Sequence, residues 1–277
     1  SDGASDFGNK FGQPLICGSL LCFEHIEGAK RFGYDKVIML AGGVGYARRE
    51  DALKEKPQPG DKLVLLGGDN YRIGMGGGAV SSVATGEFGH AIELNAVQRA
   101  NPEMQKRVYN AIRALSESTS NPIKSIHDHG AGGHPNCLSE LVDDAGGKVD
   151  IDKLPLGDPS LSAKEIIGNE SQERMGLVMA PEDVSLLQQA AERERAPMYV
   201  IGEITGDGRF TFENAQTGEK PIDLVLDDMF GSVPHTVMED VTDDPVFEPL
   251  ECLQDNRSLK DYAQRVMQLE SVACKDW

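Results

Sequence analysis

Hydrophobic and polar positions along this chain alternate between two patterns. Compact apolar runs bounded by glycine, proline or charged residues predict strands buried in a sheet. These runs occupy residues 62–66, 177–179, 198–202 and 209–212. Between them, apolar residues recur at three- and four-residue steps, which is the pattern of helices with one buried face. Strands that alternate with helices predict an α/β fold in which helices cover the sheet.

Residue type marks several helix starts. Asn101-Pro102 begins the clearest helix, because asparagine is a good N-cap and proline suits the first helical position. Ser162 and Glu165 have the spacing of a capping box, which predicts the start of a short helix. Residues 181–183 are acidic at two of three positions and predict a further helix start.

The chain is predicted to have three parts. Two early apolar runs, within residues 14–23 and 36–45, are stopped by glycine and fit strands, but this region holds too few elements for a core of its own. We interpret the three parts, in order, as the end of a preceding domain with a linker, one α/β domain, and an acidic linker with a final amphipathic helix. Their predicted limits are residues 1–55, 56–247 and 248–277.

The stretch that most suggests chemistry is residues 126–136, which join a predicted strand to a predicted helix. Asp128 ends the strand, and a glycine-rich turn separates it from the helix. A carboxylate beside the unpaired N–H groups and the positive dipole end of a helix can share a magnesium ion (Mg2+) with a phosphate group. Asp128 is therefore a candidate Mg2+ ligand. The alternative is a loop carboxylate that accepts backbone hydrogen bonds.

Three histidines in the same stretch, His127, His129 and His134, suggest a transition-metal site as a second hypothesis. Neighbouring residues on an extended strand point to opposite faces, so His127 and Asp128 are poorly placed to share one ion. A hard cation at Asp128 is the better hypothesis, because magnesium prefers carboxylate oxygen.

A glycine-rich stretch, residues 67–79, follows the strand predicted at 62–66. Such a density of glycine favours sharp bends or the close approach of a ligand or another chain. Gly74, Gly76 and Ala79 match the spacing of a dinucleotide-binding fingerprint, but the residues after them would form a poor helix, so the match is weak. The sequence contains neither a Walker A motif nor a serine nucleophile elbow.

Three further polar residues are candidates for binding a small ligand. Glu170 and Gln172 lie two positions apart, so in an extended segment they face the same side and offer an acceptor and an amide. Gln98 lies just ahead of the helix that begins at Asn101, where it could present an amide to a ligand. The alternatives are a surface turn for the first pair and a solvated or capping side chain for Gln98.

Composition restricts the partners. The chain has 277 residues, of which 39% are hydrophobic and 26% charged, as in soluble globular proteins. Its formal net charge of −18 argues against nucleic acid and anionic membranes, which are bound mainly through lysine and arginine. Five cysteines without C-x-x-C spacing predict neither a disulfide framework nor a zinc site. No apolar run suits a membrane span and the first residues do not resemble a signal peptide, so we expect a cytoplasmic location.

Eight short motifs occur in a specific order between about Phe11 and Val246. They are Gly67-Gly68, Ile73-Gly74-Met75-Gly76-Gly77-Gly78-Ala79, Val97-Gln98-Arg99, Asn101-Pro102-Glu103-Met104, Ile126-His127-Asp128, Gly130-Ala131-Gly132-Gly133, Asn169-Glu170-Ser171-Gln172-Glu173-Arg174 and Glu194-Arg195-Ala196-Pro197. Together they resemble phosphoribosylformylglycinamidine synthase of the large, single-chain type. The resemblance implies a fold like the C-terminal domain of aminoimidazole ribonucleotide synthetase, with a mixed sheet covered by helices, preceded by the end of an ATP-binding domain.

The resemblance also implies a reaction, in de novo purine biosynthesis. The family is a C–N ligase with glutamine as amide donor. ATP activates the amide oxygen of formylglycinamide ribonucleotide, and ammonia from glutamine displaces phosphate to give the amidine. By similarity, Gln98, Glu170, Ser171 and Gln172 would bind the ribonucleotide, and Asp128 would hold Mg2+.

The chain differs from the family in extent and in one loop. The catalytic histidine, most ATP contacts, the second synthetase-like half and the glutaminase domain of the family have no counterpart in it, so we expect an internal fragment that is inactive alone, with no catalytic residue assigned. His129, His134 and Pro135 replace residues that are often apolar or small in the family. A surface that a missing half would cover could also let the fragment form a homodimer.

Two other hypotheses remain open from the sequence. The first is another ATP-dependent enzyme of the same superfamily, such as a selenophosphate or thiamine-phosphate enzyme, although Gln98 and the Glu170-Ser171-Gln172 set argue against it. The second is a non-catalytic module that binds phosphorylated ligands or mediates assembly, in which Asp128 and the glycine-rich loops have only structural roles.

Overall fold

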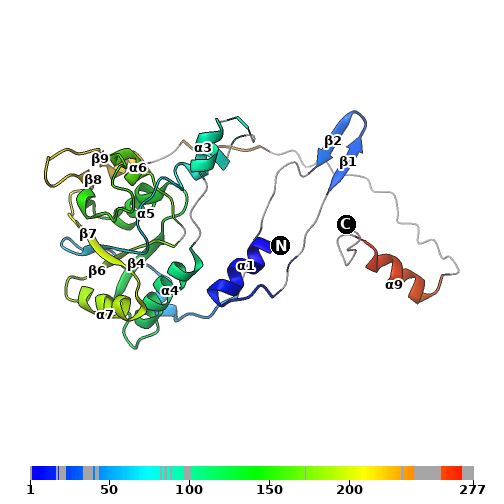
Figure 1. Ribbon diagram of the computed structural model, residues 1–277, viewed down its shortest axis with the longest axis horizontal. Coiled ribbons are helices and arrows are strands. Elements are labelled where there is room, and N and C mark those ends of the chain that lie inside the picture. The colour runs from blue at the N-terminus through cyan, green and yellow to red at the C-terminus, as the bar shows by residue number, and fades with distance from the viewer. Residues whose placement is uncertain are drawn as a thin grey trace. The chain divides into compact units, whose positions relative to one another are not determined.

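The computed structural model describes most of the chain in two compact units, each of which we describe by itself (Figure 1). One unit is Ala47–Val233, and the other combines Ser1–Tyr46 with Pro234–Trp277. The residues described are 2–16, 18, 23–33, 40, 44–81, 83, 86–87, 89–96, 101–171, 173–231, 234–239 and 257–269.

A seven-stranded mixed sheet forms the centre of the larger unit. Its strands are β3 (Lys62–Leu66), β4 (Ile123–Asp128), β5 (Gly147–Asp150), β6 (Met175–Met179), β7 (Met198–Ile204), β8 (Arg209–Glu213) and β9 (Ile222–Val225). They lie in the order β4-β6-β3-β7-β5-β8-β9. Neighbours are antiparallel except β5 and β8, which are parallel. The predicted α/β fold with a mixed sheet is confirmed, and all four apolar runs predicted to be its strands lie in β3, β6, β7 and β8.

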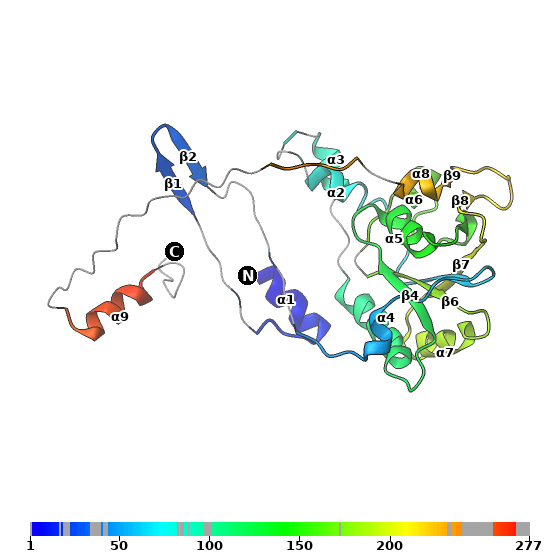
Figure 2. The same ribbon diagram turned by 180° about the vertical axis from the view of Figure 1, so that it is seen from behind.

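Helices cover both faces of this sheet, as Figures 1 and 2 show. The helices α4 (Pro102–Ser116) and α7 (Val184–Glu194) pack on one face, and α5 (Gly133–Val142) and α6 (Ala163–Ile167) on the other. Strand β3 contributes to both cores, because successive side chains of a strand point to opposite faces. Leu63 and Leu65 join the core with α5, whereas Val64 and Leu66 join the core with α4 and α7.

Short elements complete the larger unit. They are the α-helices α2 (Gly77–Ser81), α3 (His90–Asn95) and α8 (Leu226–Phe230) and the 3-10 helices η1 (Arg49–Ala52) and η2 (Ile151–Lys153).

The helix starts predicted from residue type agree with the structure. Asn101 caps α4, since its Oδ1 accepts a hydrogen bond from the Met104 amide at 3.0 Å. Ser162 and Glu165 form a complete capping box at the start of α6. The acidic residues 181–183 immediately precede α7. The caps at α4 and α6 satisfy N–H groups that a helix leaves unpaired at its first turn, whereas Asp183, the N-cap of α7, makes no side-chain capping hydrogen bond.

The smaller unit contains α1 (Asp2–Phe11), the antiparallel pair β1 (Glu24–Glu27) and β2 (Lys30–Gly33), and α9 (Leu259–Met267). Helix α9 confirms the last predicted helix. Most of the early apolar runs, residues 14–23 and 36–45, lies outside the described residues, so the strands predicted there stay a prediction. The residues of these runs that the structure describes are not in strands. Among them, Ile16 and Leu40 are more than nine-tenths exposed, so these apolar side chains do not supply the buried face that the strand prediction assumed.

The compact units describe packing, whereas the three predicted parts concern domain identity and stay a prediction. The boundaries of the compact units fall at Tyr46/Ala47 and Val233/Pro234. The predicted limits of the α/β domain, residues 56–247, stay a prediction about domain identity. None of the helices described is long and apolar enough to cross a membrane.

Candidate functional site

Strand β4 and helix α5 form the elbow that the sequence predicted. Asp128 is the last residue of β4, and α5 begins at Gly133. One oxygen of the exposed Asp128 carboxylate, Oδ1, accepts the Gly130 N–H at 2.8 Å and so stabilises the turn. Gly132 and Gly133 have φ values of +83° and +60°, which glycine adopts most readily. Asp128 thus combines a bond within its loop with an exposed carboxylate at a helix N-terminus.

The glycine-rich stretch after β3 packs against residues 169–170 of the same chain. Met75 and Asn169 form an isolated antiparallel bridge, and the Glu170 amide donates to the Gly74 carbonyl at 2.6 Å. A Cβ atom on Gly74 would lie only 2.1 Å from the Glu170 carbonyl oxygen. The glycines therefore allow a close approach between two segments of the chain that are almost a hundred positions apart.

Segment 170–171 also contacts the elbow directly. The Ser171 amide donates to the His129 carbonyl at 3.0 Å, and the Gly132 amide donates to Glu170 Oε1 at 3.1 Å. Both side chains are buried, with Glu170 2% and Ser171 1% exposed. The Ser171 hydroxyl has no hydrogen-bond partner among the described residues, although a buried hydroxyl normally has one.

The structure brings three of the five predicted site residues into one region. Asp128 lies on the elbow loop, and Glu170 and Ser171 bond to that loop. Gln98 and Gln172, the other two, lie outside the described residues. The prediction that Glu170 and Gln172 face the same side therefore stays a prediction.

A buried polar cluster lies beneath this region and was not predicted from the sequence. Arg174 is fully buried, and its Nη1 donates to His134 Nε2 at 2.9 Å. Its Nη2 donates to Asn169 Oδ1, while the Asn169 amide nitrogen donates to the carbonyls of Tyr71 and Ile73 at 2.7 and 2.6 Å. Arg174 therefore connects the start of β6 with the elbow and with the glycine-rich stretch.

The contact with Arg174 favours one tautomer of His134. His134 Nε2 lies 2.9 Å from an arginine nitrogen, which can only donate, and 3.3 Å from Asn70 Oδ1, which can only accept; the shorter contact favours Nε2 as the acceptor and the ring proton on Nδ1. The His129 ring packs edge-on against His134, with centroids 4.7 Å apart, and both of its nitrogens lack hydrogen-bond partners among the described residues. Burial lowers the pKa of both rings well below 6.5, and the charge of Arg174 lowers them further. Both histidines are neutral at physiological pH.

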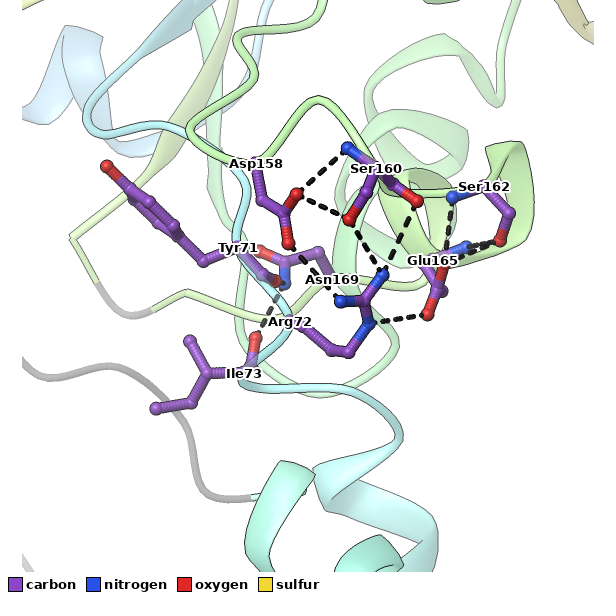
Figure 3. Close-up of polar contacts among 8 residues, drawn as sticks. All are labelled: Tyr71, Arg72, Ile73, Asp158, Ser160, Ser162, Glu165 and Asn169. Atoms are coloured by element: carbon purple, nitrogen blue, oxygen red, sulfur yellow. Dashed lines mark hydrogen bonds and ion pairs between the residues drawn. The ribbon is translucent and has the colours of Figure 1, made fainter.

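Arg72 links the glycine-rich stretch to two acidic residues, Asp158 and Glu165 (Figure 3). Its guanidinium donates to Glu165 Oε1 at 3.0 Å and to Asp158 Oδ2 at 3.3 Å. Glu165 also accepts from the Ser162 amide in the capping box of α6, and this bond together with Arg72 lowers the pKa of Glu165 to about 2. Sequence reasoning missed Arg72 because its partners are 86 and 93 positions away.

The donors at the elbow fit magnesium in kind, because Asp128 offers carboxylate oxygen beside helix N–H groups that suit a phosphate. Within the described ranges, no group of three or more His, Cys, Asp or Glu side chains could hold a metal ion. That finding does not test a magnesium ion that takes one protein carboxylate and completes its shell with phosphate and water. Asp128 as a Mg2+ ligand stays a prediction.

By its fold this protein is an α/β domain: helices cover both faces of a mixed sheet, and a glycine-rich elbow joins β4 to α5. The sequence model described as "AIR synthase related protein, C-terminal domain" matches residues 58–213. The chain belongs to this family.

Its relatives include phosphoribosylformylglycinamidine synthase of Saccharomyces cerevisiae, which is 41% identical over 99% of this chain. The enzyme of the same name from Dictyostelium discoideum is 41% identical over 84% of the chain. The chain covers 21% and 18% of those proteins, so it spans about a fifth of the curated relatives it matches. The resemblance stated from the motifs is confirmed.

Solved structures share the fold. Thermotoga maritima PurL complexed with FGAR superposes with a TM-score of 0.68 at 22% identity, covering 89% of this chain and 39% of that one. The same protein complexed with ATP gives a TM-score of 0.64 at 21% identity, covering 90% and 38%. At these identities the likeness establishes the fold alone.

Proposed function

We propose that this chain is a substrate-binding domain of phosphoribosylformylglycinamidine synthase, a C–N ligase of de novo purine biosynthesis. The whole enzyme would convert formylglycinamide ribonucleotide, glutamine and ATP to formylglycinamidine ribonucleotide. Identity of 41% over 99% of the chain with the yeast enzyme supports this proposal. The observation that carries it is structural: the loop after Asp128 is hydrogen-bonded directly to Glu170 and Ser171.

Within this proposal, the elbow binds the charged part of the reactants. Asp128 would hold Mg2+, which when bound neutralises phosphate charge. The N-terminus of α5 suits an anionic oxygen through the positive end of its helix dipole, since the amides of Gly132 and Gly133 are already paired within the chain. The buried Ser171 hydroxyl is a donor and acceptor for the ribonucleotide, and Gln98 and Gln172 complete the proposed substrate set. These residues bind and orient, and none is assigned a catalytic step.

The reaction also needs ATP and ammonia from glutamine, and these needs fall to other parts of a larger protein. We propose that most ATP contacts and a glutaminase domain lie outside this chain, that the chain alone does not form the amidine, and that the protein acts in the cytoplasm. Thermotoga maritima PurL has been solved in complexes with FGAR and with ATP, which supports both as ligands of the whole enzyme. A homodimer of the isolated chain is a further proposal, which its mass in solution tests.

The decisive experiment titrates formylglycinamide ribonucleotide into the chain by calorimetry, with and without Mg2+. Three proteins are compared: wild type, Asp128→Ala, and Asp144→Ala, which removes an exposed carboxylate beyond the far end of α5. We expect Mg2+-dependent binding by wild type and by the control. In Asp128→Ala, affinity in Mg2+ should fall by about tenfold or more, equivalent to about 1.4 kcal/mol.

Two results would count against the proposal. If wild type does not bind the ribonucleotide, the chain is better described as a non-catalytic module for other phosphorylated ligands or for assembly. If wild type and Asp128→Ala bind with the same dependence on Mg2+, the ion is held elsewhere and Asp128 serves only the turn.

A further inference from the structure

Two glycine-rich loops meet on one short segment of the chain. Gly74 and Gly133 both have positive φ, and a Cβ on either would strike the backbone of residues 169–170, at 2.1 Å from the Glu170 carbonyl oxygen and 2.7 Å from the Asn169 carbonyl oxygen. A Cβ on Gly77 would lie 2.7 Å from Glu170 Oε2. Gly74, Gly77 and Gly133 are thus required by the volume that Asn169 and Glu170 occupy.

The Glu170 side chain holds these loops through their backbone. Its Oε1 accepts the Gly78 N–H at 3.3 Å and the Gly132 N–H at 3.1 Å. Gly78 is in the first turn of α2, and Gly132 is the N-cap of α5. One oxygen therefore joins a loop at residues 74–78 to the elbow that carries Asp128. The carboxylate is inside the protein, since Glu170 is only 2% exposed.

This geometry points to a role different from direct binding of the ribonucleotide. We propose that Glu170 is a positioning residue: its carboxylate is an internal anion that fixes the amides of Gly78 and Gly132, so that the two glycine-rich loops are held together before the ligand arrives. Asp128, on a loop that Glu170 has placed, and Ser171, which follows Glu170 in the chain, then meet the ligand. The inference rests on the proposed function, because it concerns the same site.

A glutamine substitution distinguishes a Glu170 that positions the two loops from a Glu170 that contacts the ligand through its charge. Both amides donate to one oxygen, so a glutamine at this position retains the acceptor while losing the charge. Hydrogen bonds to a neutral oxygen are weaker than bonds to a carboxylate, yet they keep buried N–H groups paired. Alanine removes the acceptor altogether and leaves two inward-facing amides without it. If Glu170 instead met the ligand through its charge, glutamine would be nearly as harmful as alanine.

The test uses the 277-residue chain as wild type, Glu170→Gln and Glu170→Ala. The matched control is Glu182→Gln, which removes one exposed negative charge beyond the opposite end of β6. Amide hydrogen exchange at Gly78 and Gly132 is measured by NMR without ligand. Binding of formylglycinamide ribonucleotide with Mg2+ is measured by calorimetry on the same samples.

We expect Glu170→Gln and Glu182→Gln to keep both amides protected and to bind the ribonucleotide with nearly wild-type affinity. In Glu170→Ala, exchange at both glycines should accelerate and affinity should fall, each by about tenfold or more, as for the loss of a hydrogen bond to a charged group. Protection and affinity should therefore change together across the variants.

Any separation of the two measurements overturns the inference. Loss of affinity in Glu170→Gln with both amides still protected would show that the charge contacts the ligand. Protected amides in Glu170→Ala, or lost protection with unchanged affinity, would show that the loops do not depend on this carboxylate. If wild type itself fails to bind, the proposed function fails, and the exchange data alone still decide whether Glu170 positions the loops.

Discussion

Removing the buried guanidinium of Arg174 should lower the stability of this fold. Arg174 is fully buried and donates to His134 Nε2 and to Asn169 Oδ1. Arg174→Met preserves a long, flexible side chain but removes every donor. Both acceptors would then remain buried without the guanidinium, and the connection between the elbow and the glycine-rich stretch would be lost.

The size of the effect follows from these two acceptors. A buried polar group left without its partner costs about 1–3 kcal/mol, so two cost about 2–6 kcal/mol. The desolvation penalty of the arginine charge disappears at the same time, which offsets part of this cost. We therefore expect the free energy of unfolding to fall by about 3 kcal/mol. For a domain of this size, that corresponds to a decrease in Tm of about 6–12 °C.

Urea unfolding followed by far-ultraviolet circular dichroism measures this change. Tryptophan fluorescence is a poor probe, because the single tryptophan, Trp277, does not belong to the compact unit that contains Arg174. The control is Arg113→Met, which removes an exposed arginine that pairs with Glu117 one turn along α4, and should leave stability nearly unchanged. A loss of less than about 1 kcal/mol in Arg174→Met would refute the reasoning, because water or nearby groups would then satisfy both acceptors.

Two further predictions concern the same region. Gly74→Ala should destabilise the protein more than Gly76→Ala. Both glycines have positive φ, but a Cβ at position 74 would lie 2.1 Å from a backbone oxygen, whereas a Cβ at position 76 would have nothing within 4 Å. Equal urea midpoints for the two variants would contradict this prediction. The free energy of unfolding should also fall as pH drops below about 6.5, since His129 and His134 stay neutral when folded and take up protons when unfolded. The slope should reach about 1.4 kcal/mol per pH unit for each histidine, His134→Gln should reduce it, and a flat profile between pH 7.5 and 5.5 would exclude this explanation.

Local patterns determined much of the architecture. The apolar run at residues 62–66 predicts β3 because a strand buried on both faces needs apolar side chains at successive positions. Asn101-Pro102 predicts the start of α4 because capping depends on neighbouring residues only. The elbow at Asp128 follows from a strand, a glycine turn and a helix that are adjacent in sequence.

The contacts that organise the candidate site depend on residues far apart in the chain. The sequence by itself determined the order of strands and helices, the elbow and the candidate residues, since each depends on hydrophobic periodicity, capping or a contiguous motif. Only the tertiary structure decided that Arg72 reaches Glu165, that Arg174 joins His134 to Asn169, and that Glu170 accepts two glycine amides. The physical reason is that a buried charge takes its partners from whatever the packing of the sheet brings within hydrogen-bond distance, and no local pattern encodes that choice.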